Sequence, residues 1–438
     1  MACGILLLPC RSPASCEWEI PADDVRGVGV NDVIDVRHGS ACHLRRKGDD
    51  RHASWGEIAA GLVRIFLDAR DDLMEVLTGV ATLRSAEDEL FRSLRALSGA
   101  GWEIQRNSPG ALRKVASFLP SNNLLYSYVL FGVIPSLYAD RLCMRPSARV
   151  TDTAMALDAV VGPALRGLGC GLDLTPVSQR EFMTTCLTAD AVVFTGQPRN
   201  ADAVAAKLGT DTLMVALGSG PNPIVVGLEA KLARACQDIV EARVYNSGQD
   251  CLCPDIVFVH ESVMKEVVER LEDLLTRVVI GERHSPGVQV APLVYQDAVA
   301  GASEFIDRHR ENVVSGGSVD ADGFVEPTLV SLPWNPDFHP PELFSPIVTL
   351  MEYSSPSDIE AWMASPCESE RGMYVSVYGE PALDRERVAT SVVTRECTTF
   401  DIEDGNRPFG GYGASASSVR HRGTRTARPV LLSAEVRR

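Results

Sequence analysis

A cysteine-bearing loop between a helical pattern and an apolar strand is the stretch best suited to chemistry. Residues 229–243 have helical spacing, and 256–259 is a short apolar run typical of a buried strand. The loop between them carries Gly248 and Cys251. A thiolate attacks carbonyl carbon readily, so a thiol aimed by rigid elements into a cleft indicates covalent catalysis. The alternative is that Cys251 is a small core residue, as most free cysteines are.

A second thiol, Cys253, lies two residues beyond Cys251. In extended backbone the two side chains would face the same side, so Cys253 could act as a resolving thiol. The alternative is again a small core residue. The twelve cysteines are otherwise scattered without CxxC spacing, which argues against a structural zinc site and predicts no bound metal. Scattered cysteines also favour a reducing, cytoplasmic location over a disulfide framework.

Composition narrows the class of protein. The 438 residues are 45% hydrophobic and 23% charged, as in ordinary globular proteins. The net charge of −16 argues against nucleic-acid binding, although residues 420–428 are basic. The chain contains no apolar run of about 20 residues, so no transmembrane helix is expected. The apolar run at residues 5–8 is too short for a signal peptide.

Strands, glycine turns and helices alternate along the chain. This alternation predicts an α/β fold with two doubly wound lobes, whose sheets bind ligands at the carboxyl ends of their strands. The turn at Gly196 opens a helix whose free N–H groups could face a pyrophosphate. No GxGxxG fingerprint follows any expected strand. The strands are expected at 32–36, 141–144, 189–194, 213–217, 223–226, 256–259, 347–351 and 373–378; the helices at 55–73, 85–97, 151–161, 200–208, 262–278, 298–309, 357–363 and 380–388.

The lobes are expected to join near residue 218. We assign residues 1–217 to a cofactor-binding domain, with a candidate oligomerisation hairpin near 101–118. Residues 218–406 form the catalytic domain that contains the cysteine. Residues 407–438 form a returning tail, in which 429–436 is the candidate oligomerisation strand.

Four short motifs, taken together, resemble the aldehyde dehydrogenase superfamily. They occur in that family's order and at roughly its spacings, and the similarity covers about residues 55–438. The motifs are Phe194-Thr195-Gly196, Asn246-x-Gly248-Gln249-x-Cys251, Glu342-Leu343-Phe344-Ser345-Pro346 and Pro408-Phe409-Gly410-Gly411.

The resemblance implies an NAD- or NADP-dependent enzyme with a modified Rossmann domain that lacks the usual glycine fingerprint. Glu342 matches the carboxylate that binds the nicotinamide ribose, and Phe344 the ring beside it. Arg145 stands where the family usually has the lysine of K-P-S, and its guanidinium could pair with the 2′-phosphate of NADP. The alternative is an arginine on the sheet rim. The other expected cofactor contacts are Phe194, Gly196 and Gly218.

The same resemblance assigns the catalytic roles. Cys251 matches the nucleophile, and an asparagine amide would hold the oxyanion with the backbone N–H of Cys251. The stretch 120–123 aligns with the family in two ways. Against the P-W-N of hydrolytic members the amide belongs to Asn122; against the P-T-x-N of the acylating, CoA-dependent branch it belongs to Asn123.

One departure bears on the reaction. Hydrolytic members carry a general-base glutamate where this chain has Ala216, and an alanine cannot activate water. We therefore expect the acylating branch: NAD(P)H-dependent reduction of an acyl thioester to an aldehyde through an acyl-cysteine, or the reverse oxidation. The thioester would be carried by CoA or by an acyl carrier protein.

Two alternatives stay open. The first is a hydrolytic aldehyde dehydrogenase that uses another base, such as Asp250 or Glu229. The second is a non-catalytic scaffold with the same fold. His339, near the position of a histidine in the acylating branch, is expected in an exposed loop. The resemblance also implies a homodimer or homotetramer, and a substrate tunnel near Tyr126, Phe131 and residue 400.

Overall fold

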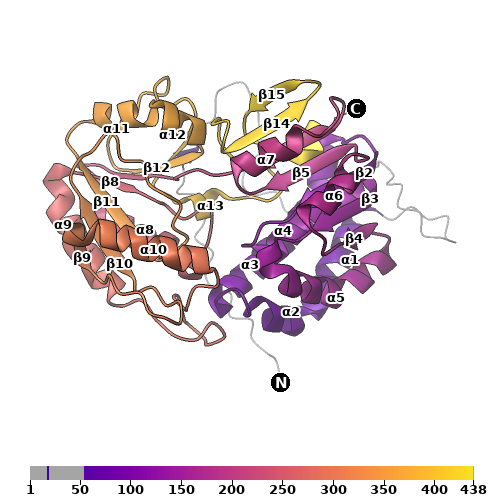
Figure 1. Ribbon diagram of the computed structural model, residues 1–438, viewed down its shortest axis with the longest axis horizontal. Coiled ribbons are helices and arrows are strands. Elements are labelled where there is room, and N and C mark those ends of the chain that lie inside the picture. The colour runs from indigo at the N-terminus through magenta and orange to yellow at the C-terminus, as the bar shows by residue number, and fades with distance from the viewer. Residues whose placement is uncertain (1–16, 19–53, 438) are drawn as a thin grey trace.

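The computed structural model describes residues 17–18 and 54–437, which form two lobes, each built on one β-sheet (Figure 1). The first lobe holds a seven-stranded sheet in the order β15-β14-β6-β5-β2-β3-β4. The second holds an eight-stranded sheet in the order β1-β13-β12-β7-β8-β11-β10-β9. The short helix α13 (Thr399–Ile402) lies between the lobes in this view. The predicted α/β class with two lobes is confirmed.

In the seven-stranded sheet the strands β6, β5, β2, β3 and β4 pair in parallel. Helices α1 to α5 pack on one face, around a core that includes Leu62, Phe66 and Leu97, and α6 and α7 cover the other face around Phe118 and Phe182. The strands are β2 (Leu112–Phe118), β3 (Ala139–Arg145), β4 (Leu172–Leu174), β5 (Ala191–Thr195), β6 (Leu213–Leu217), β14 (Ser417–His421) and β15 (Thr424–Ala427). The helices are α1 (Trp55–Asp68), α2 (Arg70–Leu77), α3 (Leu83–Asn107), α4 (Leu124–Tyr128), α5 (Thr151–Leu168), α6 (Gln179–Cys186) and α7 (Pro198–Ala205).

The eight-stranded sheet is also covered on both faces. Helices α8 and α9 pack on one face around Ile239 and Leu271, and α10 and α11 pack on the other around Phe305 and Trp362. The strands are β1 (Glu17–Trp18), β7 (Ile224–Val226), β8 (Val257–His260), β9 (Val313–Ser315), β10 (Thr328–Leu332), β11 (Ile347–Tyr353), β12 (Tyr374–Tyr378) and β13 (Val392–Arg395). The helices are α8 (Leu232–Val244), α9 (Glu261–Leu275), α10 (Gln296–Arg308), α11 (Pro356–Met363) and α12 (Pro366–Arg371).

The tail closes the molecule by returning to the first lobe. β14 pairs antiparallel with β6 and places Ser418 opposite Ala216. Short helix α14 (Leu432–Glu435) then packs against α3, where the Asn107 side-chain amide donates to the Ser433 hydroxyl at 2.9 Å. No helix among the described residues is long and apolar enough to cross a membrane.

Most predicted elements are present with shifted ends, but three predictions are wrong. Residues 101–118 form the end of α3 and the buried strand β2, because the helical pattern continues through Ile104 to Asn107. Residues 429–436 form α14 and one β-bridge, not a strand. Residues 380–388 are irregular, because the Asp384 carboxylate accepts from the Glu386 N–H and so competes with helical bonds. The expected strand at 32–36 lies outside the described residues.

Candidate active site

The loop that carries Cys251 leaves α8 through left-handed backbone. Asn246, Ser247 and Gly248 have φ values of 47°, 59° and 80°. A Cβ on Gly248 would lie 2.3 Å from the Ser345 carbonyl oxygen, so glycine is required there by both conformation and space. The loop is therefore held tightly against the segment that contains Ser345.

The same loop is tied to the start of α3 in the other lobe. The Asn246 side-chain oxygen accepts from the Thr82 N–H at 3.2 Å, and the Asn246 N–H donates to the Ser85 hydroxyl at 3.0 Å. These bonds are buried. They fix the cysteine loop relative to both lobes. This agrees with the prediction that rigid elements aim the Cys251 thiol.

Cys251 sits in a turn six residues before β8. The Asp250 carboxylate accepts from the Leu252 N–H at 2.8 Å, and the Cys253 N–H donates to the Asp250 carbonyl at 3.2 Å. Asn222 donates to the Cys251 carbonyl at 2.7 Å. Cys251 is partly exposed as a residue, whereas Leu252 and Cys253 are each 2% exposed. The backbone is a turn rather than extended, so the condition for a same-side thiol is not met, and Cys253 is a core residue, one of the two interpretations expected from the sequence.

The surroundings of the thiol keep it protonated at rest. Burial raises the pKa of Cys251 well above its usual range, and the neighbouring carboxylates of Asp250 and Glu342 raise it further. Arg92 acts in the opposite direction. On its other side the residue packs against an apolar cluster that includes Tyr374.

The two candidate oxyanion amides have different environments. Asn123 is already engaged: its amide donates to the Asp250 carboxylate at 2.8 Å, and its oxygen lies 3.4 Å from an Arg92 nitrogen. The Asn122 amide nitrogen is buried and has no hydrogen-bond partner among the described residues. A buried donor without a partner is costly, and it is available to a ligand oxygen. The geometry therefore favours Asn122.

Arg145 and Gly196 lie at the carboxyl edge of the first sheet. Arg145 ends β3 and is half-buried, with Nε donating to the Val177 carbonyl at 2.9 Å. Gly196 follows β5 with φ of 137°, and α7 begins two residues later without a side-chain cap from the described part of the chain. An uncapped helix N-terminus after β5 and a guanidinium at the end of β3 lie at the same edge of the sheet, on either side of β2, and they suit the phosphates of a dinucleotide.

Two other predicted cofactor residues are explained by packing. Phe194 is 5% exposed, and its ring lies 5.1 Å from that of Phe118 in the core beneath α6 and α7. A Cβ on Gly218 would lie 2.0 Å from the Ser415 carbonyl oxygen. Gly218 therefore allows the tail to approach β6, and its small size needs no cofactor to explain it.

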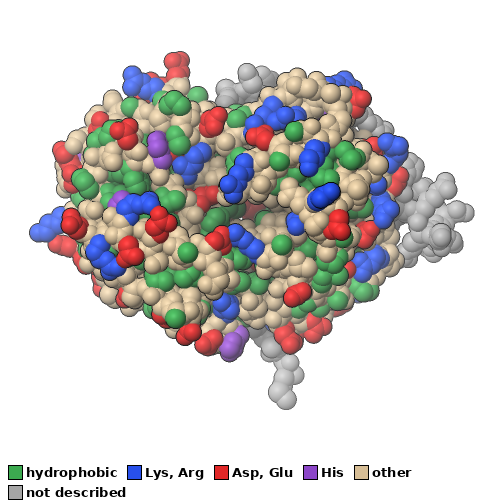
Figure 2. Space-filling view, in the orientation of Figure 1, with side chains coloured by type: hydrophobic (Ala, Val, Ile, Leu, Met, Phe, Trp, Pro, Cys, Tyr) green, Lys and Arg blue, Asp and Glu red, His purple; other side chains and the backbone are tan. Residues whose placement is uncertain are grey.

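Glu342 and Phe344 lie on the segment that faces the cysteine loop. Burial raises the pKa of Glu342, and a hydrogen bond from Ser219 opposes that effect. The Glu342 carboxylate also raises the pKa of Cys251, so these two predicted site residues act on one another electrostatically. Phe344 is partly buried with φ of 47°. On the face shown in Figure 2 a hollow lies between the two lobes.

None of the bases considered from the sequence occupies the place of the missing glutamate. Ala216 is on β6 and packs toward the core beneath α6 and α7. Glu229 is exposed in a turn after β7, whereas Cys251 precedes the parallel strand β8, so the two lie at opposite ends of the sheet. The Asp250 carboxylate is occupied by Asn123 and by the Leu252 N–H.

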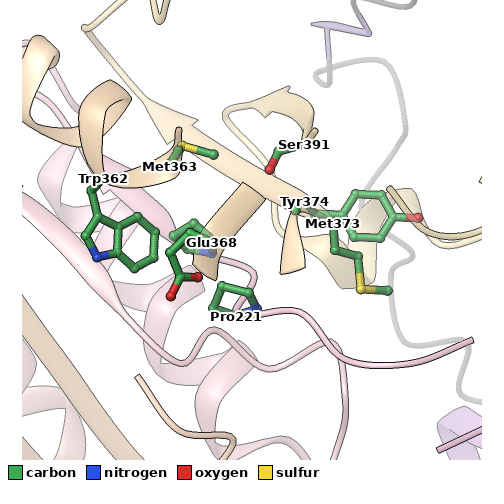
Figure 3. Close-up of a pocket in the computed structure, with 9 residues that line it drawn as sticks. Pro221, Trp362, Met363, Glu368, Met373, Tyr374 and Ser391 are labelled. Carbon is green, nitrogen blue, oxygen red and sulfur yellow. The ribbon is translucent and has the colours of Figure 1, made fainter. Parts of the chain in front are cut away.

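His339 is engaged by Glu368, whose carboxylate lies 2.7 Å from its Nδ1. His339 is exposed, as predicted. Glu368 and Tyr374 line a cavity of about 10 Å³ (Figure 3), with room for about one water molecule. This cavity is too small for an aldehyde or thioester. Glu368 with His339 and Cys367 could in principle hold a cation, but Arg371 already neutralises the carboxylate at 3.0 Å.

Sequence reasoning missed a charged group beside the site. Arg92 and Glu89 of α3, Tyr245 and Glu403 all interact near the thiol. Arg92 is three residues after Glu89, a spacing that usually marks a solvated helix face, so the sequence carries no signal that sets it apart. Tyr126, an expected tunnel residue, is buried and donates to Glu403.

The family model described as "Aldehyde dehydrogenase family" matches residues 177–430, more than half of the chain. NADP(+) succinate-semialdehyde dehydrogenase GabD of Escherichia coli is 28% identical over 314 residues, covering 62% of each chain. A glutarate-semialdehyde dehydrogenase of Pseudomonas putida is 26% identical over 288 residues, covering 63% of this chain and 58% of its own length. The chain thus spans about three-fifths of the length of these relatives.

Solved structures support the fold. An E. coli structure described as an NADP-dependent enzyme superposes with a TM-score of 0.73 at 19% identity, covering 88% of this chain and 84% of its own. Succinate-semialdehyde dehydrogenase from Burkholderia pseudomallei gives a TM-score of 0.72 at 21% identity, covering 85% and 83%. At these identities the likeness concerns the fold.

Proposed function

The chain belongs to the aldehyde dehydrogenase family, and from that premise we propose that it catalyses NAD(P)-dependent oxidation of an aldehyde through an acyl group on Cys251, with a thiol as the acyl acceptor. The observation that carries the proposal is that Cys251 is not fully buried, while Asn122, the neighbour of the Asn123 that bonds Asp250, has a buried amide nitrogen without a hydrogen-bond partner among the described residues. The reverse reaction, reduction of a thioester, uses the same groups.

In the first step the Cys251 sulfur adds to the carbonyl carbon after loss of its proton. The carbonyl oxygen becomes an oxyanion, which the Asn122 amide and the Cys251 backbone N–H stabilise. One donor of this kind is typically worth about 3–4 kcal/mol. A partly buried site strengthens both hydrogen bonds because little water competes for them.

The cofactor fits the residues present. The N-terminus of α7 and the Arg145 guanidinium would hold its phosphates, and Glu342 its nicotinamide ribose. The charge of Arg145 supports NADP over NAD. When bound, the nicotinamide supplies the hydride acceptor for oxidation of the thiohemiacetal on Cys251. The chain's part is to hold that adduct still and to exclude water.

Ala216 supports the choice of a thiol as acceptor. Breakdown of an acyl-cysteine by water needs a positioned base, which contributes typically ~10²–10⁴-fold. A thiol attacks the same carbonyl carbon without such help once it ionises, forming a new C–S bond while the bond to Cys251 breaks. CoA or a carrier-protein thiol is the proposed class of acceptor.

A second candidate is oxidation to a free acid, and the comparisons favour it. The similar proteins named above are succinate- and glutarate-semialdehyde dehydrogenases, and the free Asn122 amide matches the hydrolytic alignment better than the acylating one. For this candidate, a residue other than Ala216 must act as the general base that activates water.

One experiment separates the candidates. Purified protein is mixed with NADP or NAD and a panel of aldehydes, with and without CoA, and NAD(P)H is followed. The proposal expects a single burst without CoA and steady turnover with it, giving a thioester. Steady turnover to free acid without CoA would support the second candidate. Failure to bind either nucleotide or to label Cys251 with iodoacetamide would leave the scaffold alternative.

A further inference from the structure

Arg92 is a buried cation on α3 that contacts groups from three other segments. Its Nε lies 2.9 Å from the Asp88 carboxylate, and an Nη donates to the Tyr245 hydroxyl at 2.7 Å. Its guanidinium also lies over the Tyr245 ring and over the Tyr126 ring, 5.6 Å and 4.9 Å from the centroids. Its other Nη is 4.0 Å from Glu403. With a side chain only 10% exposed, Arg92 is held in one place.

From Arg92 a chain of hydrogen bonds leads to the nucleophile. The Tyr245-bound nitrogen of Arg92 also contacts the Asn123 side-chain oxygen at 3.4 Å. Orienting that oxygen points the Asn123 amide at the Asp250 carboxylate, 2.8 Å away. The other Asp250 oxygen accepts from the Leu252 N–H at 2.8 Å. The last bond closes the turn on which Cys251 stands.

Charge acts in the same direction as geometry. The acidic neighbours Asp250 and Glu342 oppose ionisation of the Cys251 thiol, and Arg92 is the cation that favours it. Cys253 adds a further unfavourable contribution, and Tyr374 also interacts with Cys251. Removing the Arg92 charge takes away the cation that favours the thiolate, while the Asp250 and Glu342 carboxylates that oppose it remain.

We propose that Arg92 is a positioning residue for the nucleophile: through Asn123 and Asp250 it fixes the Cys251 turn, and its charge offsets that of Asp250 beside the thiol. This role rests on the proposed function of Cys251. It deepens that function, because it assigns to α3 of the cofactor lobe a part in preparing the thiol of the other lobe.

The test is the pH dependence of Cys251 alkylation by iodoacetamide in the full chain, followed by peptide mass spectrometry. Arg92→Met should raise the midpoint by about one pH unit and slow labelling about tenfold at neutral pH, as expected for loss of a cation that favours the thiolate. Arg92→Lys should keep the midpoint near that of the unaltered protein but lower kcat, because a lysine cannot hold both Tyr245 and Asn123. Arg95→Met, on an exposed position of the same helix, should change neither.

Asp250→Asn provides the complementary variant. It should lower the midpoint by itself and should cancel much of the shift when combined with Arg92→Met, because it removes the charge that Arg92 offsets. If Arg92→Met does not fold, Arg92→Lys and Asp250→Asn still decide the matter. The proposal is overturned if Arg92→Met and Arg95→Met have the same alkylation profile, or if Asp250→Asn leaves the midpoint unmoved. Absence of preferential labelling in the unaltered protein would instead remove the proposed function itself.

Discussion

The Arg243 guanidinium donates two hydrogen bonds to the backbone carbonyl of Ser345, at 2.9 and 2.7 Å. Arg243 lies in the last turn of α8, just before the cysteine loop, and Ser345 belongs to the segment that carries Glu342. Arg243 is 1% exposed and also pairs with Asp255 at 3.0 Å. The loop that carries Cys251 and the segment that carries Glu342 are therefore packed together as one buried unit. A substitution in either segment should alter the position of the other.

Gly248 tests how tightly that unit is packed. Gly248→Ala adds a Cβ 2.3 Å from the Ser345 carbonyl at a φ of 80°, so we expect a loss of about 2–5 kcal/mol in unfolding free energy. Gly287→Ala is the matched control, with φ of 79° and no described atom within 4 Å, and should cost about 1–2 kcal/mol. Urea unfolding of both variants provides the comparison; equal losses would show that backbone conformation, not the contact with Ser345, decides.

Glu342 should influence both thiol and cofactor. Because its carboxylate opposes ionisation of Cys251, Glu342→Gln should lower the pKa of the thiol and speed alkylation at neutral pH. The same change should weaken NADP binding, since the ribose would lose a charged acceptor. Alkylation rates and nucleotide titration by fluorescence measure the two effects. Weaker labelling together with tighter nucleotide binding would contradict both assignments.

The fold and a candidate nucleophile could be predicted from the sequence, but the network around that cysteine could not. Cys251 stood out because a glycine turn and a strand flank it, and the ordered motifs supplied its role. The choice between Asn122 and Asn123 was open because adjacent amides differ only in which one Asp250 occupies. Arg92 had no signal, because burial of a helical charge depends on Tyr126 and Tyr245 from elsewhere in the chain. The strand predicted at 429–436 was wrong for a related reason. Whether a segment as short as Leu432–Glu435 forms a helix or a strand depends on what it packs against.

Glu89 predicts a pH dependence of stability. Burial raises its pKa from 4.5 to about 7, so the folded state holds this proton more tightly than the unfolded state. The stabilisation is complete below about pH 4.5 and is lost as pH rises to 7. In the unaltered protein the Tyr126 N–H donates to the Glu89 carboxylate at 3.0 Å. Glu89→Gln keeps an oxygen that can accept this hydrogen bond but has no charge to bury. Between pH 5 and 8 the variant should therefore gain about 2–3 kcal/mol relative to the unaltered protein in denaturant titrations. A difference that stays constant with pH would show that Glu89 is ionised in the fold.

The adjacent residues Asn122 and Asn123 have different predicted roles, which substitution of each by alanine can distinguish. Asn122→Ala removes a donor that is free for the oxyanion, so kcat should fall about 10²–10³-fold while alkylation of Cys251 keeps its rate and midpoint. Asn123→Ala breaks the bond to Asp250, so the cysteine turn should loosen: alkylation should change, and unfolding free energy should fall by about 1–3 kcal/mol. Each variant is the control for the other, measured by steady-state turnover, iodoacetamide labelling and urea unfolding. If Asn123→Ala instead gives the large loss of kcat with normal labelling, Asn123 is the oxyanion donor, as the acylating alignment predicts. The hydrogen bond between Asn123 and Asp250 must then break when substrate binds.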